Sequence, residues 1–186
     1  RSIPRQLAKE NPKFRYSEVK PKANKRDYFA PIDWLDASGM IYKVHRLEAP
    51  LSPLSGYESN DSFKVYLSDT GLLTHMCGLH YRDLLPDVHN IYKGAVTENY
   101  VMQQFASKNR ALYYFKPSES MEIDLVSDLN EQIIPIEIKS GRNKRSTGLR
   151  NYREKYQPDY AIRFSELNFG WQDQLYSIPL YAAWCI

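Results

Sequence analysis

The stretch that most constrains the fold of this 186-residue chain runs from Tyr113 to Gly141 and carries charges where a buried strand normally has none. It reads as two strands joined by a short polar turn. Over residues 134–139 three isoleucines alternate with Pro, Glu and Lys. Because side chains alternate faces along a strand, Glu137 and Lys139 are expected on one face and the isoleucines in the core.

The first of these strands contributes a second carboxylate. Ile123 and Leu125 are expected to point one way, with Asp124 and its alternate neighbours pointing the other. If the two strands pair, Asp124 approaches Glu137 and Lys139. The resulting pattern is an Asp, a Glu thirteen positions later, one residue, and a Lys.

Such a cluster suits metal-assisted hydrolysis of a phosphodiester. Two close carboxylates repel each other unless a cation lies between them, and Mg²⁺ prefers oxygen ligands while keeping several waters. We expect Asp124, Glu137 and the carbonyl of Ile138 to be the metal ligands, with Mg²⁺ or Mn²⁺ as cofactor. Lys139 would orient or help deprotonate the attacking water. The alternative is a structural ion pair between Lys139 and a carboxylate.

A fourth candidate residue lies on a helix predicted over residues 94–108. Glu98 falls on the same stripe as Val101, Met102 and Phe105 of that helix. A carboxylate on a buried face needs a partner or a metal. Glu98 is therefore either a catalytic or metal-positioning residue, or it forms a salt bridge to Lys139 or to a nearby Arg.

These features resemble the restriction-endonuclease-like (PD-(D/E)XK) nuclease superfamily, through the helix with Glu98, the EID strand with Asp124, the IEIK strand with Glu137 and Lys139, and the basic helix that follows. More closely, the chain resembles the C-terminal half of a family of prokaryotic AAA-type ATPases. The passages that carry this likeness are SIPRQLAKEN at 2–11, WLDASGMIYKV at 34–44, FKVYLSDTGLL at 63–73, YKGAVTENYV at 92–101 and IIPIEIKSG at 133–141.

The resemblance implies a nuclease-type site in this chain and an ATPase module upstream of it. The chain begins at Arg1 rather than Met, and we expect it to be a piece of a longer protein. It contains no G-x-x-x-x-G-K-[S/T] motif, so this piece is not expected to bind ATP through a P-loop.

The net charge of +3 conceals two basic runs, one in residues 1–26 and one in residues 139–155. Either run can neutralise phosphates without reading sequence, and either can be a solvated surface. For the first run we favour the solvated surface. For the second, which begins at the proposed catalytic lysine, we favour nucleic-acid contact through Arg142, Lys144, Arg145, Arg150 and Arg153.

The predicted fold is α+β with two domains. Residues 1–85 read as helices followed by two strands with a long Pro/Ser/Gly loop, which suggests a small winged-helix-like domain. Residues 86–186 read as a nuclease-like αβββαβ domain, which the resemblance implies is a restriction-endonuclease-like mixed sheet flanked by helices. A further strand is expected over residues 175–184.

Two hypotheses follow. The first is a Mg²⁺-dependent nuclease domain that acts on nucleic acid, with DNA favoured. The second is a catalytically inactive module that binds nucleic acid or protein under control of the upstream ATPase. No run of residues is apolar enough to suggest a membrane span, and two distant cysteines, Cys77 and Cys185, fit the reducing cytoplasm.

Overall fold

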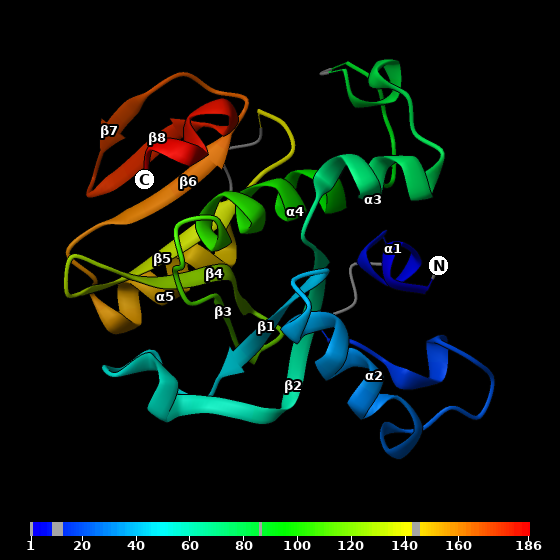
Figure 1. Ribbon diagram of the computed structural model, residues 1–186. Helices are drawn as coiled ribbons and strands as arrows, with labels where there is room; N and C mark the ends of the chain where they lie inside the picture. The colour runs from blue at the N-terminus through cyan, green and yellow to red at the C-terminus, as the bar shows by residue number, and fades with distance from the viewer. Residues whose placement is uncertain (1, 9–12, 86, 143–145) are drawn as a thin grey trace.

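A computed structural model of the chain describes residues 2–8, 13–85, 87–142 and 146–186. Within these residues eight strands form one mixed sheet in the order β2-β1-β3-β4-β5-β6-β8-β7, with helices on both sides (Figure 1). The prediction of an α+β fold with a mixed sheet flanked by helices is confirmed.

The described residues form α-helices, β-strands and short 3-10 helices with the following bounds. The α-helices are α1 (Ser2–Ala8), α2 (Lys25–Ala37), α3 (Thr70–Cys77), α4 (Lys93–Ala106) and α5 (Thr147–Tyr156). The strands are β1 (Ile41–Leu47), β2 (Glu58–Leu67), β3 (Tyr113–Ser118), β4 (Met121–Leu129), β5 (Gln132–Ile138), β6 (Ala161–Ser165), β7 (Gly170–Gln172) and β8 (Leu175–Pro179). Short 3-10 helices are η1 (Tyr16–Glu18), η2 (Leu54–Tyr57), η3 (Tyr81–Leu84) and η4 (Leu180–Cys185).

The stretch from Tyr113 to Gly141 contains three strands rather than the two read from its sequence, because its first six residues form β3 by themselves. The turn between β4 and β5 is formed by Asn130 and Glu131, with φ angles of 56° and 65°. Two consecutive positive φ angles produce the mirror-image turn whose twist matches that of a two-stranded hairpin. This turn aligns Leu125 with Ile136 across the two strands.

The hairpin of β1 and β2 extends the same sheet, since β1 pairs in parallel with β3 through His45 and Tyr113. These are the two strands predicted for the wing of residues 1–85. One sheet therefore includes strands from both predicted domains. The division at residue 85 stays a prediction.

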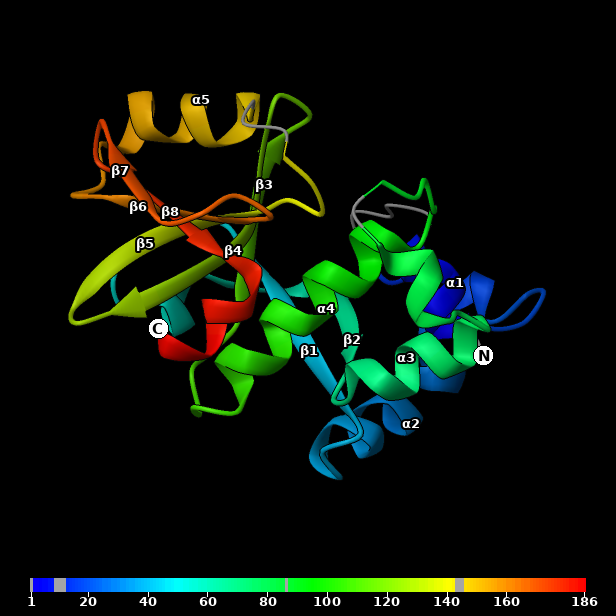
Figure 2. The same cartoon turned by 90° about the horizontal axis from the view of Figure 1, so that it is seen from above.

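Apolar side chains fill both faces of the central strands. Helix α4 covers one face with Val101, Met102 and Phe105, which belong to the same cluster as the alternating isoleucines of β5 at 134, 136 and 138. Helix α5 covers the other face with Leu149 and Tyr152. Figure 2 shows these two helices on opposite sides of the sheet. The charged ends of β4 and β5 are thus held by a packed layer on each side.

Two further elements bear on the sequence predictions. The helix expected over residues 94–108 is α4, so that prediction is confirmed. The strand expected over residues 175–184 ends at Pro179, and η4 replaces its second half. Within the described part of the chain, no helix combines the length and the apolar character needed to cross a bilayer. Both cysteines are free thiols.

Candidate active site

A cavity of about 1020 Å³ lies where α4, β2, β4 and the end of β5 meet. Its lining includes every residue predicted to be catalytic or to bind metal, namely Glu98, Asp124, Glu137, Ile138 and Lys139. The sequence placed these residues on three separate elements, and the fold brings them to one cavity. It adds residues that the sequence analysis did not single out, chiefly Lys64 and Glu122.

Asp124 reaches the cavity because β4 contains an irregularity. Tyr113 and Phe115 of β3 face Val126 and Ile123 of β4, so three steps along β4 match two along β3. Such a bulge interrupts the strict alternation of faces. Ile123 consequently packs in the cluster on the α5 side, whereas Leu125 packs in the cluster on the α4 side. The prediction that Ile123 and Leu125 share a face is therefore wrong.

A hydrogen bond fixes the Asp124 carboxylate. Its Oδ2 accepts from the backbone N–H of Ile138 at 2.8 Å. The backbone pairing of β4 with β5 ends at Leu125 and Ile136, so this side chain continues the link between the strands beyond the ladder. The contact holds the carboxylate beside the residues that flank Ile138 on β5.

Burial raises the pKa of Asp124 well above its usual value, and the nearby carboxylates of Glu137 and Glu98 raise it further. The Lys64 ammonium and the Ile138 N–H act in the opposite direction without compensating. Removing a carboxylate from water while placing others beside it disfavours its ionised form. A cation bound at this position would favour the ionised form again.

Glu137 is almost fully buried, with 4% of its surface exposed. Its Oε1 lies 2.5 Å from Nζ of Lys139, while its Oε2 is buried with no hydrogen-bond partner among the described residues. A buried carboxylate oxygen without a partner is costly. Burial lowers the pKa of Lys139, but the carboxylates of Glu137, Asp124 and Glu98 together raise it more, so that it lies above its usual value.

Glu98 has partners that the sequence did not predict. Among the described residues, neither Lys139 nor an arginine makes its salt bridge. Instead its Oε1 accepts from Nζ of Lys64 at 3.2 Å and from the hydroxyl of Tyr66 at 2.5 Å. The sequence signal was the alternation in β2, where Lys64 and Tyr66 fall on one face and Phe63 and Val65 on the other.

Lys64 also links Glu98 to a second group of charges. Its Nζ lies 3.3 Å from Oε1 of Glu122, and Nζ of Lys116 lies 2.8 Å from Oε2 of Glu122. Burial raises the pKa of Glu122, but Lys64 and Lys116 together lower it below its usual value. The carboxylates of Glu98 and Glu122 therefore already have cationic partners within the protein.

Asp124 and Glu137 are the residues that fit a cation. Among the described residues no three His, Cys, Asp or Glu side chains form a metal-binding group. Mg²⁺ does not need such a group, because it is commonly held by one or two carboxylates and several waters. The unpartnered Oε2 of Glu137 and the raised pKa of Asp124 both indicate carboxylates that a cation would stabilise.

The basic residues predicted to bind nucleic acid differ in their exposure and contacts. Arg142 and Arg150 are exposed, and Arg150 pairs weakly with Glu154 across 3.8 Å. Arg153 donates to the carbonyl of Asp173 in the β7–β8 turn, which gives it a structural contact. The predicted contacts of Lys144 and Arg145 lie outside the described residues.

Helix α5 begins beside the cavity. Ser146 caps it by accepting from the N–H of Leu149, and both Ser146 and Gly148 line the cavity. A Cβ on Gly148 would collide with the backbone carbonyl oxygen of Glu122. Only glycine allows this close approach of helix and strand.

Two family models match the chain. Residues 93–182 match a domain of unknown function, DUF4143, and residues 1–83 match another domain of unknown function, DUF8612. Two uncharacterized proteins, from Mycobacterium bovis and Mycobacterium tuberculosis, are each 34% identical over 108 residues. The alignment covers 57% of this chain and 24% of each relative, so the chain spans about a quarter of their length. No solved structure matches significantly.

Proposed function

We propose that this chain carries a Mg²⁺-dependent phosphodiesterase site that cleaves nucleic acid, in a domain of the restriction-endonuclease-like (PD-(D/E)XK) type. The observation that carries the proposal is the pair Asp124 and Glu137 at the wall of the large cavity. One has a pKa raised by burial and by neighbouring carboxylates, and the other has a buried oxygen without a partner. Both properties fit a site built to receive a cation.

Asp124, Glu137 and the carbonyl of Ile138 would hold the metal. When bound, Mg²⁺ supplies positive charge that stabilises a phosphoryl oxygen and makes water more acidic. Lys139 remains an ammonium because its pKa is raised, so it would orient the attacking water and balance charge on the phosphate rather than accept a proton. Glu98, fixed by two contacts from β2, would hold that arrangement in place.

Nucleic acid is the proposed substrate, with DNA favoured by the likeness to restriction endonucleases. The cavity has room for a phosphate backbone, and Lys93, Lys116 and Lys139 line it together with the fixed Lys64. Lysine ammoniums neutralise phosphates without reading sequence. Exposed Arg142 lies three residues after Lys139 and would extend this contact outward.

An upstream ATPase module and a cytoplasmic location are also proposals. From the resemblance to AAA-type ATPases we propose a nucleotide-driven module before this chain, and the two mycobacterial relatives are long enough to contain additional domains. ATP would act on that module and not on the piece described here. Two free thiols fit a protein of the reducing cytoplasm.

A second candidate function is a nuclease-like module that binds nucleic acid or protein without cleaving it. The observation in its favour is that Glu98, Glu122 and one oxygen of Glu137 already have ammonium partners. Charges of this kind can persist as a structural network. Such a module should take up no divalent metal at Asp124.

Calorimetric titration with Mn²⁺ separates the two candidates. The wild type and Asp124→Asn are titrated, and each is incubated with plasmid and single-stranded DNA. Asparagine keeps an acceptor for the Ile138 N–H, so the fold should survive. The matched control is Asp128→Asn, an exposed carboxylate on the same strand. We expect binding and cleavage to vanish only in Asp124→Asn. Absence of metal uptake by the wild type would overturn the nuclease proposal.

A further inference from the structure

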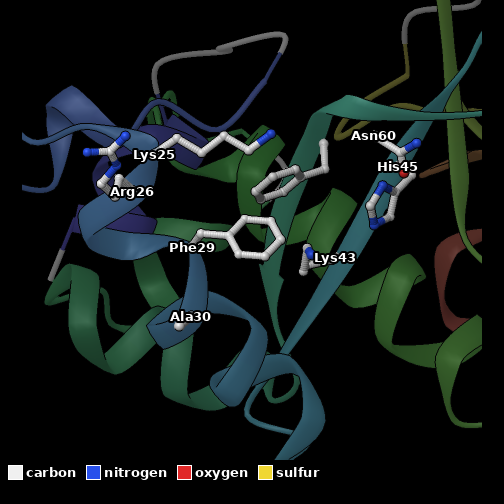
Figure 3. A pocket seen from close by; sticks show the side chains of 8 residues that line it. Lys25, Arg26, Phe29, Ala30, Lys43, His45 and Asn60 are labelled. Atoms are coloured by element: carbon white, nitrogen blue, oxygen red, sulfur yellow. The ribbon is translucent and has the colours of Figure 1, made fainter.

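A second cavity, of about 620 Å³, lies between α2 and the β1–β2 hairpin. Among the described residues, the ionisable side chains that line it are all basic: Lys25, Arg26, Lys43 and His45. Figure 3 shows Lys25 reaching from α2 toward the rings, Arg26 at the outer side of α2, and Lys43 and His45 on β1. We call this cavity the α2 cleft. Its walls are suited to an anionic ligand.

Aromatic rings lie among these basic side chains. Phe29 of α2 is 42% exposed, and its ring centre is 5.6 Å from Nζ of both Lys25 and Lys43 (Figure 3). Phe63 of β2 is buried, and Nζ of Lys43 lies 4.9 Å from its ring centre. An exposed phenylalanine ring flanked by ammoniums can stack on a flat ligand that also carries negative charge.

The cations at the mouth of the α2 cleft can bind a ligand with little loss of folding stability. Lys25 pairs with Asp61 at 3.0 Å, but its side chain is 53% exposed and that of Asp61 is 88% exposed. Exposed pairs of this kind contribute little to stability, so a phosphate can replace the carboxylate. Arg26 makes no ion pair with any described residue. The deeper Lys43 is held by Asp33 at 2.7 Å and keeps its position.

The α2 cleft is separate from the candidate active site. Phe63 lies in the cluster on the α2 side of the hairpin, whereas the next residue, Lys64, lines the active-site cavity. Because neighbouring residues of a strand point to opposite faces, β2 separates the two cavities. A ligand in the α2 cleft therefore needs neither Asp124 nor a metal.

We propose that the α2 cleft binds single-stranded nucleic acid, with an unpaired base against Phe29 and the adjoining phosphates on Lys25 and Arg26. Stacking of a base on an aromatic side chain combined with a basic groove is the usual basis of single-strand binding. The volume is in the range of pockets that hold a small ligand, such as one nucleotide. In a duplex both faces of each base are covered, so an unpaired base is required.

Fluorescence anisotropy in EDTA tests the stacking contact without any cleavage. The probes are a labelled oligothymidine and an abasic strand of the same length, which has the phosphates but no bases. For Phe29→Leu we expect about tenfold weaker binding of oligothymidine and nearly unchanged binding of the abasic strand. Equal weakening on both strands would overturn the stacking contact, and so would no weakening on either.

Matched controls come from Tyr81 and Arg82, a second exposed aromatic and arginine pair with the ring centre 5.6 Å from the guanidinium carbon. Tyr81→Leu should leave both affinities unchanged. Arg26→Gln should weaken both strands and reduce the dependence of binding on salt by about one counterion, whereas Arg82→Gln should do neither. A loss of the same size in the controls, or no binding of oligothymidine by the wild type, would overturn the proposal.

The outcome of the binding experiment does not depend on whether the chain is a nuclease. Loss of cleavage in Asp124→Asn with intact binding of oligothymidine would support both proposals. Binding by a wild type that takes up no Mn²⁺ would leave the α2 cleft standing and remove the nuclease. Thermal unfolding of each variant checks that Phe29→Leu has not disturbed the packing of α2.

Discussion

The two faces of the β1–β2 hairpin carry similar charges in different surroundings. On one face Lys64 contacts Glu98, with side chains only 10% and 23% exposed. On the other face Lys25 contacts Asp61, with side chains 53% and 88% exposed. The lengths of the two ion pairs, 3.2 Å and 3.0 Å, are nearly equal. Burial, rather than distance, distinguishes them.

This difference separates a site that fixes its charges from a surface that can exchange them. A buried charge that loses its partner has no water to replace it, so the pair at Lys64 must stay intact. An exposed charge that loses its partner is simply hydrated. The first arrangement suits a reaction site with fixed groups, and the second suits a binding surface whose cations pass from a carboxylate to a phosphate.

The largest expected effect is at Lys64. Lys64→Met should lower the free energy of unfolding by about 3–5 kcal/mol, because Glu98 and Glu122 both lose a buried cation. Urea unfolding followed by circular dichroism measures it. Adding Glu98→Leu to this variant should recover part of the loss, since one carboxylate is no longer left unpaired. A loss no larger than that of Lys25→Met would contradict the comparison.

The wall formed by α5 provides the next test. Gly148→Ala should cost about 1–3 kcal/mol, because the new methyl group meets the backbone of Glu122 and the helix must shift. Gly141→Ala is the control, since a Cβ there has no neighbour within 4 Å. Equal stability of the two variants in urea unfolding would mean that the wall is not tightly packed.

The pH dependence of stability tests Asp124. Because its pKa is raised in the folded chain, the folded form keeps a proton that the unfolded form has lost. That contribution is complete below the ordinary carboxyl pKa and disappears as pH rises through the raised value, with a slope of up to about 1.4 kcal/mol per pH unit. In EDTA, Asp124→Asn should flatten this fall relative to Asp128→Asn. An unchanged slope in Asp124→Asn would argue against a buried, proton-binding carboxyl.

The smallest effect is expected on the exposed face. Asp61→Asn should change the free energy of unfolding by only about 0–1 kcal/mol, because the ion pair with Lys25 is largely in water. The same variant should strengthen binding of oligothymidine in the anisotropy assay, since one competing carboxylate is gone. Weaker binding in Asp61→Asn would show that this carboxylate is not a competitor for Lys25.

Local patterns in the sequence identified Glu98, Asp124 and Glu137 of the candidate site but not Glu122 or Lys64. Alternation along β5 identified Glu137 and Lys139, and the stripe of α4 identified Glu98. Lys64 was missed because its contact with Glu98 spans 34 positions and depends on how α4 packs against β2. No local pattern contains that packing.

The bulge in β4 shows a second limit of sequence patterns. Strict alternation predicted one face for Ile123 and Leu125, and one extra residue in the strand separated them. A bulge depends on how the partner strand is paired and so leaves no periodic signal of its own. The sequence pattern did not separate β3 from β4, since only a two-residue connection at Glu119 and Ser120 joins them.

The parallel pairing of β1 with β3 has a consequence for inheritance and for engineering. Residues 1–83 match one family model and residues 93–182 match the other. Strand β1 of the first segment pairs with β3 of the second, and Lys64 of the first forms an ion pair with Glu98 of the second. A gene cut between them would leave β3 with an open hydrogen-bonding edge, which is a known route to aggregation. The two segments should therefore be exchanged between proteins only as a unit, and Lys64 and Glu98 are expected to vary together.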